Sequence, residues 1–516
     1  MSLPIRWLLP VSLAATTALA QGAPAALADA GVGDAAAAAA AASAPTAAAP
    51  ATPAAAQPKK IDPKLFDTAL NDYFTGHPKD AAPKLFDYTE NLPSTDENYA
   101  WAQFFLAKSL IELNLRHAGA VYLARIARER SNPAVLPRAL EELQKLTDLP
   151  HDEVMIDEQV FGALDLGFLP EEVAGYAHYQ QGLVDLRVGN ERWATTHFSK
   201  LPETSAEASR AKYAMLVTRL RSAKRELPKE MVDQFLELTK DQKLTQEARN
   251  DAMLAVARLR YEQGDFAGAL EAYAGVKLPE LDPGRATLYL EEAWTRYQLG
   301  QVHAAMGILT TLDAPSFREE FLPDKYLLKA LIYRDLCHYL PAKRAAKELT
   351  RKYAESLDAV REREDLTGDT RLLRAASAKG TTRRAHKFLQ SLELEGEQLG
   401  RYAGTFGDRM FGYMTRLYDL ARAEAQRVYN QRLQESVRGE ADKLLRAAEQ
   451  VRLMEYEVGL KLYERVKKGS KLVAVIEEEP IKPDQVAFPF VDEYWNDELR
   501  SYRFSLKSRC IEETAR

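Results

Sequence analysis

One five-point pattern recurs along the chain and constrains its fold more than any other feature. In the segment RYEQGDFAGALEAY, residues 260–273, a helix-forming run stops at Gly264 and restarts at once. Counted from this glycine, small residues stand at −7 and +5 and large ones at −3 and +9, namely Ala257, Ala269, Tyr261 and Tyr273. Glycine adopts the left-handed C-cap conformation at little cost, so the pattern predicts one helix that ends at Gly264 and a second that follows directly.

The same pattern surrounds Gly76, Gly189 and Gly300 and, in weaker form, Asn114 and Cys337. Asparagine also tolerates the left-handed conformation. From the first site to the last the intervals are 38, 75, 75, 36 and 37 residues, so the long intervals are twice the short ones. Two degenerate units are therefore expected near residues 151 and 226, where TDLPHDE and KRELPKE read as turns.

Eight units with a period near 37 residues predict an all-α solenoid. The small residues let two antiparallel helices approach closely, and the large residues fill the space beside that contact. One hairpin cannot bury both of its faces, so neighbouring hairpins must stack. The alternative is an irregular helical domain in which this spacing arises by chance.

The pattern around YEQGDFAGALEAY resembles the tetratricopeptide repeat, over residues 61–353. The resemblance implies a helical-hairpin solenoid that binds proteins through a concave groove lined by the first helix of each unit. The interval here is longer than the 34 residues of that family, which leaves the superhelix pitch open.

The resemblance places groove residues at −13, −10, −6, −3 and −2 from each turn. Their mixture of aromatic, basic and acidic side chains suits an extended peptide, and about half of the positions are expected to serve helix packing instead. The candidates in the fourth, sixth, seventh and eighth units, with Trp294 as the strongest, are Tyr176, Tyr179, Arg187, Leu254, Arg258, Glu262, Leu290, Trp294, Gln298, Asp324, Leu327 and Arg334.

The first 60 residues read as an export signal and a tether. Arg6 precedes the apolar run WLLPVSLAATTALA, and Ala18-Leu19-Ala20 predicts a signal peptide, residues 1–20, cleaved after Ala20. An uncleaved anchor is the alternative, but the run is shorter than the ~20 residues that span a bilayer. Residues 21–60 are mostly Ala and Pro and predict a disordered linker. This composition is typical of a GC-rich bacterial genome, so the expected location is the periplasm, without membrane insertion after cleavage.

The C-terminal third falls into two parts. Residues 354–470 predict a charged helical or short coiled-coil region, in which Ala441, Leu444, Ala448, Val451, Val458 and Leu462 form a stripe that either packs within the chain or joins two chains. Its residues Arg383, Arg384, His386 and Lys387 belong either to a solvated helix or to a site for an anionic partner. Residues 471–516 form an aromatic tail, PDQVAFPFVDEYWNDELRSYRF, that either docks on the protein's own helices or binds a partner. The two cysteines, Cys337 and Cys510, either join in a disulfide that ties this tail to the last unit or remain thiols.

No motif of catalysis or cofactor binding is present. The eight histidines lie at no metal-ligand spacing, and the chain has no P-loop, dinucleotide fingerprint or GxSxG elbow. Some soluble lytic transglycosylases carry a helical superhelix before a catalytic domain, but the motifs of that domain are missing here. We therefore expect no enzyme activity, no cofactor and no metal. The net charge of −6 gives no general footprint for nucleic acid.

These features predict a periplasmic scaffold or adaptor that binds envelope proteins or peptides. The order of signal peptide, tether, repeats and aromatic tail is similar to exported repeat proteins of myxobacteria, including components of adventurous gliding motility. The alternatives are an envelope-biogenesis chaperone for outer-membrane or secreted clients and, third, a cell-wall lytic enzyme. The oligomeric state and the partner's identity stay open.

Overall fold

A computed structural model describes residues 64–130, 132–163, 171–222, 230–280, 282–362, 365–469, 475–476, 480, 493–495 and 498–510. The predicted signal peptide, the linker, the turn expected near residue 226 and much of the aromatic tail, including Phe488 and Phe490, lie outside these residues. Every regular element within the described ranges is a helix, as expected for an all-α fold.

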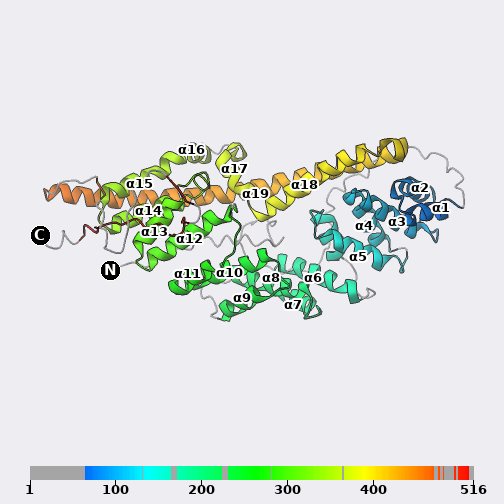
Figure 1. The fold of residues 1–516 in the computed structure, drawn as a ribbon, viewed down its shortest axis with the longest axis horizontal. Coiled ribbons are helices and arrows are strands. Elements are labelled where there is room, and N and C mark those ends of the chain that lie inside the picture. Colours follow the sequence, from blue (N-terminus) through cyan, green and yellow to red (C-terminus); the bar gives the residue numbers. More distant parts are fainter. Residues whose placement is uncertain are drawn as a thin grey trace, which may run out of the picture. The chain divides into compact units, whose positions relative to one another are not determined.

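The helices follow one another in pairs along most of the chain (Figure 1). The paired helices are α1 (Leu65–Phe74), α2 (Pro78–Asn91), α3 (Tyr99–Glu112), α4 (Arg116–Glu129), α5 (Leu136–Leu146), α6 (Glu171–Arg187), α7 (Glu191–Phe198), α8 (Ala206–Ser222), α9 (Glu230–Lys240), α10 (Gln246–Glu262), α11 (Phe266–Ala274), α12 (Gly284–Gln298), α13 (Val302–Thr311), α14 (Asp324–Asp335) and α15 (Tyr339–Lys352). They are followed by α16 (Ala354–Glu362), α17 (Thr370–Ser377), α18 (Gly380–Gly400) and α19 (Ala403–Lys467), which has non-helical backbone angles at Gly407.

All six turn positions found in the sequence lie at the corner between two helices and have a positive φ. The angles run from 61° at Asn114 and Cys337 to 81° at Gly76 and Gly264. At Gly264 the backbone N–H donates to the Tyr261 carbonyl (3.0 Å), and the next N–H, of Asp265, donates to Arg260 (2.9 Å). The same two bonds recur at the other five corners, as in a Schellman cap. The prediction of helical hairpins closed at these six residues is confirmed.

The small residues of the pattern lie where the paired helices touch. Ala257 and Ala269 are fully buried on either side of the Gly264 turn, as are Ala293 and Ala305 beside Gly300. At the Asn114 hairpin, the +5 residue is Gly119, and a Cβ there would collide with the Ile111 side chain and the Ala107 carbonyl. The close approach of the two helices therefore explains why these positions hold alanine or glycine.

The unit expected near residue 151 departs from the pattern. After α5 and the turn at Pro150 the chain forms a short π-helix, η1 (Val154–Val160), and a 3-10 turn, η2 (Phe161–Ala163), in place of a full second helix. Ile156, Val160 and Phe161 of this segment are buried. No left-handed residue closes this corner.

The chain divides into two compact units, each of which gathers segments from distant parts of the sequence. Among the described residues, one unit, called the N-terminal unit here, comprises those within 64–194 and 391–421, and the other, the C-terminal unit, comprises those within 195–390 and 422–510. The helices α7, α18 and α19 each contribute residues to both units.

In the N-terminal unit, the end of α18 and the start of α19 pack on the second helices of the hairpins. The buried Glu395 carboxylate accepts hydrogen bonds from the His117 backbone N–H (2.8 Å) and the Tyr418 hydroxyl (2.7 Å). Arg125 donates to the Tyr413 hydroxyl (3.0 Å), and the Phe86 ring lies 5.4 Å from that of Tyr413. These contacts reach α2 and α4, so the C-terminal helices cover the second-helix side of this unit.

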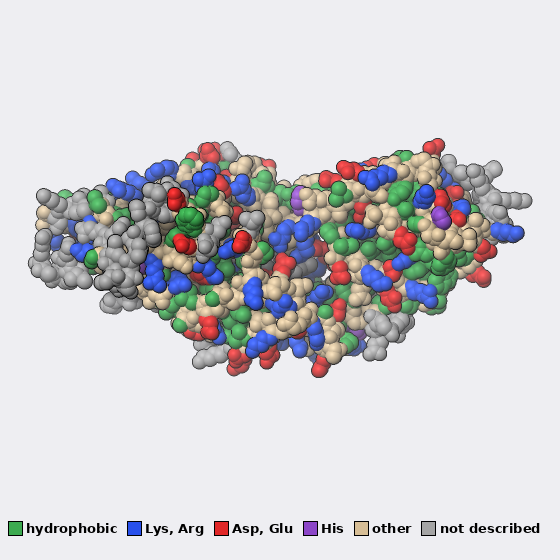
Figure 2. Space-filling view, in the orientation of Figure 1, with side chains coloured by type: hydrophobic (Ala, Val, Ile, Leu, Met, Phe, Trp, Pro, Cys, Tyr) green, Lys and Arg blue, Asp and Glu red, His purple; other side chains and the backbone are tan. Residues whose placement is uncertain are grey.

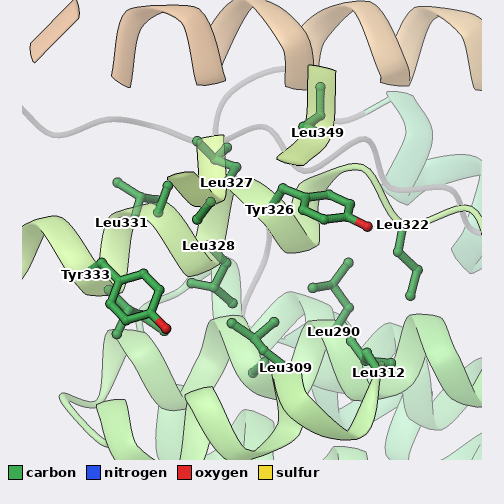
Figure 3. Close-up of a cluster of buried hydrophobic side chains, with 14 of the residues drawn as sticks. Leu290, Leu309, Leu312, Leu322, Tyr326, Leu327, Leu328, Leu331, Tyr333 and Leu349 are labelled. Carbon is green, nitrogen blue, oxygen red and sulfur yellow. The ribbon is translucent and has the colours of Figure 1, made fainter. Parts of the chain in front are cut away.

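In the C-terminal unit, α12–α15 form a large apolar core that α19 completes (Figure 3). Leu290, Leu309 and Leu312 lie on α12 and at α13, and Leu327, Leu328 and Leu331 come from α14. The α19 residues in this core are Leu444, Ala447, Val451, Met454 and Val458. The apolar stripe of residues 441–462, which the sequence predicts to pack either within the chain or between two chains, therefore packs within the chain.

The described part of the tail lies along α13 and ends at the corner between α14 and α15. The Phe504 N–H donates to the His303 carbonyl (3.0 Å), and the Arg509 N–H donates to that of Leu336 (3.1 Å). A Cβ at Gly307 would overlap the Tyr502 carbonyl, so a glycine is needed where the tail backbone crosses α13. A disulfide joins Cys337 to Cys510 across 173 residues and ties the tail to this corner.

Candidate protein-binding surface

The twelve predicted groove residues fall into three groups in the structure. Tyr176, Tyr179, Leu290, Trp294 and Leu327 are buried, with 1 to 8% of their surface exposed. Arg187, Arg258 and Arg334 form ion pairs within the chain, and Leu254 and Asp324 are partly buried. Only Glu262 and Gln298 among the twelve are exposed. As a set, these residues do not line one open groove.

Trp294, the strongest candidate, is 5% exposed and belongs to the core of the C-terminal unit. Its ring meets Tyr297 edge-on, with centroids 6.1 Å apart. Leu290, four residues earlier, lies in the same core, which also includes Leu499 and Leu506 of the tail. The expectation that Trp294 and Leu290 present themselves to a partner is wrong, because their side chains pack against the protein itself.

The candidates of the eighth unit face α19. Arg334 pairs with Glu457 (3.0 Å), and Leu327 lies in the core that α19 completes. Burial raises the pKa of Asp324 to about 6, and the nearby Lys443 and Arg446 of α19 partly offset that rise. Asp324, Leu327 and Arg334 therefore interact with the long helix α19 in this structure.

The remaining buried or paired candidates serve packing between neighbouring helices. Tyr176 meets the Phe161 ring edge-on at 4.7 Å and accepts a hydrogen bond from Gln180 (2.7 Å). Arg258 makes a two-pronged bond to Glu291 on the next first helix, at 3.0 and 2.7 Å. Such bonds join consecutive hairpins and explain why aromatic and charged residues occupy these positions without a partner.

An open aromatic surface lies instead on the first helices of the first two hairpins. It consists of Tyr73 and Phe74 on α1 and Trp101 and Phe105 on α3, and we call these four residues the aromatic face. Phe74 is 70% exposed, and the other three are partly exposed. Phe105 lies at the centre, with ring centroids 5.3 Å from Tyr73, 5.5 Å from Phe74 and 6.0 Å from Trp101.

Charged residues from α3 and α5 border the aromatic face. The Arg138 guanidinium lies over the Trp101 ring at 5.2 Å from its centroid, and its side chain is exposed. Glu142 pairs with Lys108 of α3 (2.9 Å) and with Lys145 (2.8 Å), and these pairs hold the pKa of Glu142 below its usual value against the opposing effect of burial.

Tyr73 connects the rings to this charged border. Its hydroxyl donates to Glu112 (2.7 Å), and burial followed by that carboxylate raises its pKa well above the usual range. Tyr73 is therefore a neutral hydrogen-bond donor at any physiological pH, and the bond fixes the edge of the aromatic face. The surface thus combines pre-positioned rings with fixed charges, an arrangement suited to binding an extended chain.

The aromatic face stays open because the C-terminal helices of this unit cover the other side. Their contacts reach Phe86, Asn91, His117 and Arg125, all on second helices. The aromatic face lies on α1 and α3, the first helices. On α1 and α3, the face that the repeat resemblance assigns to partner binding is therefore not covered by the helices that the structure describes.

The sequence did contain a signal for this surface. Tyr73 and Phe74 stand at −3 and −2 from Gly76, and Trp101 and Lys108 stand at −13 and −6 from Asn114. Counted from the unit expected near 151, Arg138 stands at −13. The same offsets that were applied to the later units would have found Tyr73, Phe74 and Trp101 in the first two units, but not Phe105, which stands at −9 from Asn114.

Charges of both signs are interspersed over the side of the molecule shown in Figure 2. The described residues contain no group of three or more His, Cys, Asp or Glu side chains arranged to hold a metal ion. None of the described helices combines the length and the apolar composition that crossing a membrane requires. Arg383, one of the residues considered for an anionic partner, pairs with Glu247 (3.0 Å), and the His386 ring lies 5.2 Å from that of Tyr429.

Comparisons with known proteins give matches among solved structures. Neither protein-family models nor curated proteins match the chain. Among solved structures, the chain is similar to one described as "Crystal Structure of the Yeast Tom70", with 13% identity, a TM-score of 0.28, and coverage of 78% of this chain and 91% of that chain. At this TM-score we draw nothing about function from the likeness. The paired helices with their Schellman corners are consistent with the tetratricopeptide-repeat family.

Proposed function

We propose that this protein is a non-catalytic scaffold that binds an extended segment of a partner protein on the aromatic face. The observation that carries the proposal is the ring cluster on the first helices, in which Phe74 is 70% exposed and Tyr73, Trp101 and Phe105 are partly exposed. Clustered aromatic rings in a soluble protein mark an interaction site, because they leave apolar area in contact with water.

The border of the aromatic face favours a particular kind of segment. Apolar side chains of the partner would pack against Phe74 and Phe105, and a carboxylate beside them would meet the exposed Arg138. Because the cations Lys108 and Lys145 are already paired with Glu142, Arg138 is the cation best placed to set the register of the bound segment.

We further propose that this scaffold works in the periplasm, within a cell-envelope assembly such as a gliding-motility machine. The signal peptide that the sequence predicts at residues 1–20 and the Ala/Pro tether that follows support this location. Cell fractionation tests it: the protein should be recovered with periplasmic contents and should begin after Ala20.

Capture from envelope extracts tests the scaffold itself. Full-length protein is compared with the double variant Phe74→Ala/Phe105→Ala and with the control Leu394→Ala, which removes another side chain that is 65% exposed in the same unit. We expect the double variant to lose at least about tenfold in partner recovery, since truncation of an aromatic hot spot at the centre of an interface costs about 2 kcal/mol or more. The control should recover the same partners as the natural protein.

The set of captured proteins separates the scaffold from its alternatives. A small, fixed set of envelope proteins supports an adaptor in one machine. A broad range of newly exported outer-membrane proteins would instead identify a chaperone, and lysis zones in a cell-wall gel would identify a lytic enzyme. Equal capture by the double variant and the control would contradict the assignment of the aromatic face.

A further inference from the structure

The last four turns of α19 have two apolar faces on opposite sides of the helix. Val451, Met454 and Val458 are buried in the core of the C-terminal unit. On the opposite side, Leu453, Tyr456, Leu460 and Tyr463 are 67, 68, 46 and 68% exposed. These four residues, called the outer stripe, follow one another in steps of three, four and three, the spacing of a coiled-coil seam.

We infer that the outer stripe binds the same stripe of a second copy of this chain, with the two α19 helices antiparallel around a two-fold axis. This interaction is separate from the partner site proposed above, because it uses a different unit and different residues. A seam needs a second helix with the same spacing, and another copy of α19 supplies one.

The charges at the ends of the outer stripe favour antiparallel over parallel pairing of the two helices. The seam spacing continues to Glu449, four residues before Leu453, and to Lys467, four residues after Tyr463. Both side chains are exposed, and neither has an ionic partner within the described part of the chain. Antiparallel pairing sets Glu449 of each helix against Lys467 of the other, whereas parallel pairing sets like charges against each other.

The apolar residues are self-complementary in the same register. Leu453 of one helix faces Tyr463 of the other, and Tyr456 faces Leu460, so each layer joins a leucine to a tyrosine ring. Every layer then occurs twice, as a two-fold axis requires.

Two residues beside the axis fit this arrangement. Gly459 has open space where a Cβ would lie, so the two backbones can approach closely there. Glu457 would come near its own copy, but Arg334 pairs with it at 3.0 Å and offsets the repulsion.

The expected dimer is weak. The seam spans residues 449–467, or about 27 Å of helix at about 1.5 Å per residue. It is therefore smaller than a standard interface of about 800 Å² per partner, and we expect a dissociation constant roughly in the micromolar range.

Sedimentation equilibrium of the full chain without its predicted signal peptide tests the inference, under non-reducing conditions and over about 1 to 100 μM. We expect a monomer–dimer equilibrium. Leu460→Glu should raise the dissociation constant at least about tenfold, because it places a charge in the central layer. The matched control, Leu420→Glu, changes a leucine of α19 that is 61% exposed but outside the outer stripe, and it should dimerise like the natural chain. Circular dichroism should show that each variant keeps its helix content.

Charge exchange tests the direction of the two helices. Glu449→Lys and Lys467→Glu should each weaken the dimer, because each replaces two attractive end contacts with repulsive ones. The double exchange should restore the natural dissociation constant. Single exchanges without effect would overturn the antiparallel arrangement, and a natural chain that stays monomeric throughout the range, or a Leu460→Glu variant that dimerises unchanged, would overturn the inference as a whole.

Discussion

The first helices of the two units show how one repeat position can serve two purposes. In the N-terminal unit, α1 and α3 carry the aromatic face, and Phe74 is 70% exposed. In the C-terminal unit, α12 and α14 carry Leu290, Trp294 and Leu327 at the same kind of offset, and all three are buried. In the N-terminal unit, α18 and α19 cover the second helices α2 and α4 and leave the first helices α1 and α3 open. In the C-terminal unit, α19 and the tail are part of the core formed by α12–α15. The repeat therefore sets which side chains share a face, while distant segments decide whether that face is core or surface.

The largest difference between the units should appear in a matched pair of tryptophans. Trp294→Ala should lower the free energy of unfolding of its unit by about 3–5 kcal/mol, since it leaves a cavity in a buried core. Trp101→Ala should cost about 1 kcal/mol, because that ring is partly exposed and lies on the surface. Hydrogen exchange of the amides in α12–α14 and in α1–α5 measures the two effects separately. Similar losses in both units would contradict the division into core and surface.

The disulfide offers the next way to separate the units. Cys510→Ser should destabilise the C-terminal unit by about 2–5 kcal/mol, because the bond closes a long loop and restricts the unfolded chain. The amides of α13 and of the α14–α15 corner should lose protection, since the tail contacts them through Phe504 and Arg509. The amides of α1–α4 serve as the internal control and should exchange as before. A variant in which the tail contacts stay protected would show that the backbone bonds and the core residues hold the tail without the disulfide.

The turns could be predicted from the sequence and the exposure of the groove positions could not, for one physical reason. A left-handed corner depends on local sterics, so it can be predicted at Gly264 or Asn114 from the residue type and its neighbours in the sequence. The burial of Trp294 depends on segments such as Leu499, which lies 205 positions further along the chain. The irregular unit near residue 151 was also beyond prediction, because a π turn leaves no spacing that differs clearly from a short α-helix.

Two buried groups, one in each unit, should contribute to the response to acid in opposite directions. In the N-terminal unit, burial lowers the pKa of His117 from 6.5 to about 4, so stability is present above pH 6.5 and is lost as the pH falls toward 4. In the C-terminal unit, burial raises the pKa of Asp324 from 3.8 to about 6, so stability is greatest below pH 3.8 and is lost as the pH rises through 6.

Between pH 7 and pH 5, these shifts amount to a loss of about 2 kcal/mol at His117 and a gain of about 1 kcal/mol at Asp324. Urea unfolding of His117→Gln and Asp324→Asn at both pH values checks the signs. The glutamine variant should lose less stability on acidification than the natural protein, and the asparagine variant should lose more. Equal pH dependence in all three proteins would show that neither group carries the effect.

The smallest change in stability is expected at the aromatic face itself. Phe74→Ala should alter the free energy of unfolding by no more than about 0.5 kcal/mol, because most of the ring is already in water. The same variant should nevertheless weaken partner capture, since the ring would be buried only in the complex. Leu327→Ala makes the matched contrast: it removes a side chain that is 1% exposed and should destabilise the C-terminal unit by about 2–5 kcal/mol. It should leave partner binding by the folded N-terminal unit unchanged. A Phe74 variant that unfolds as readily as the Leu327 variant would show that the ring supports the fold and is not a free surface.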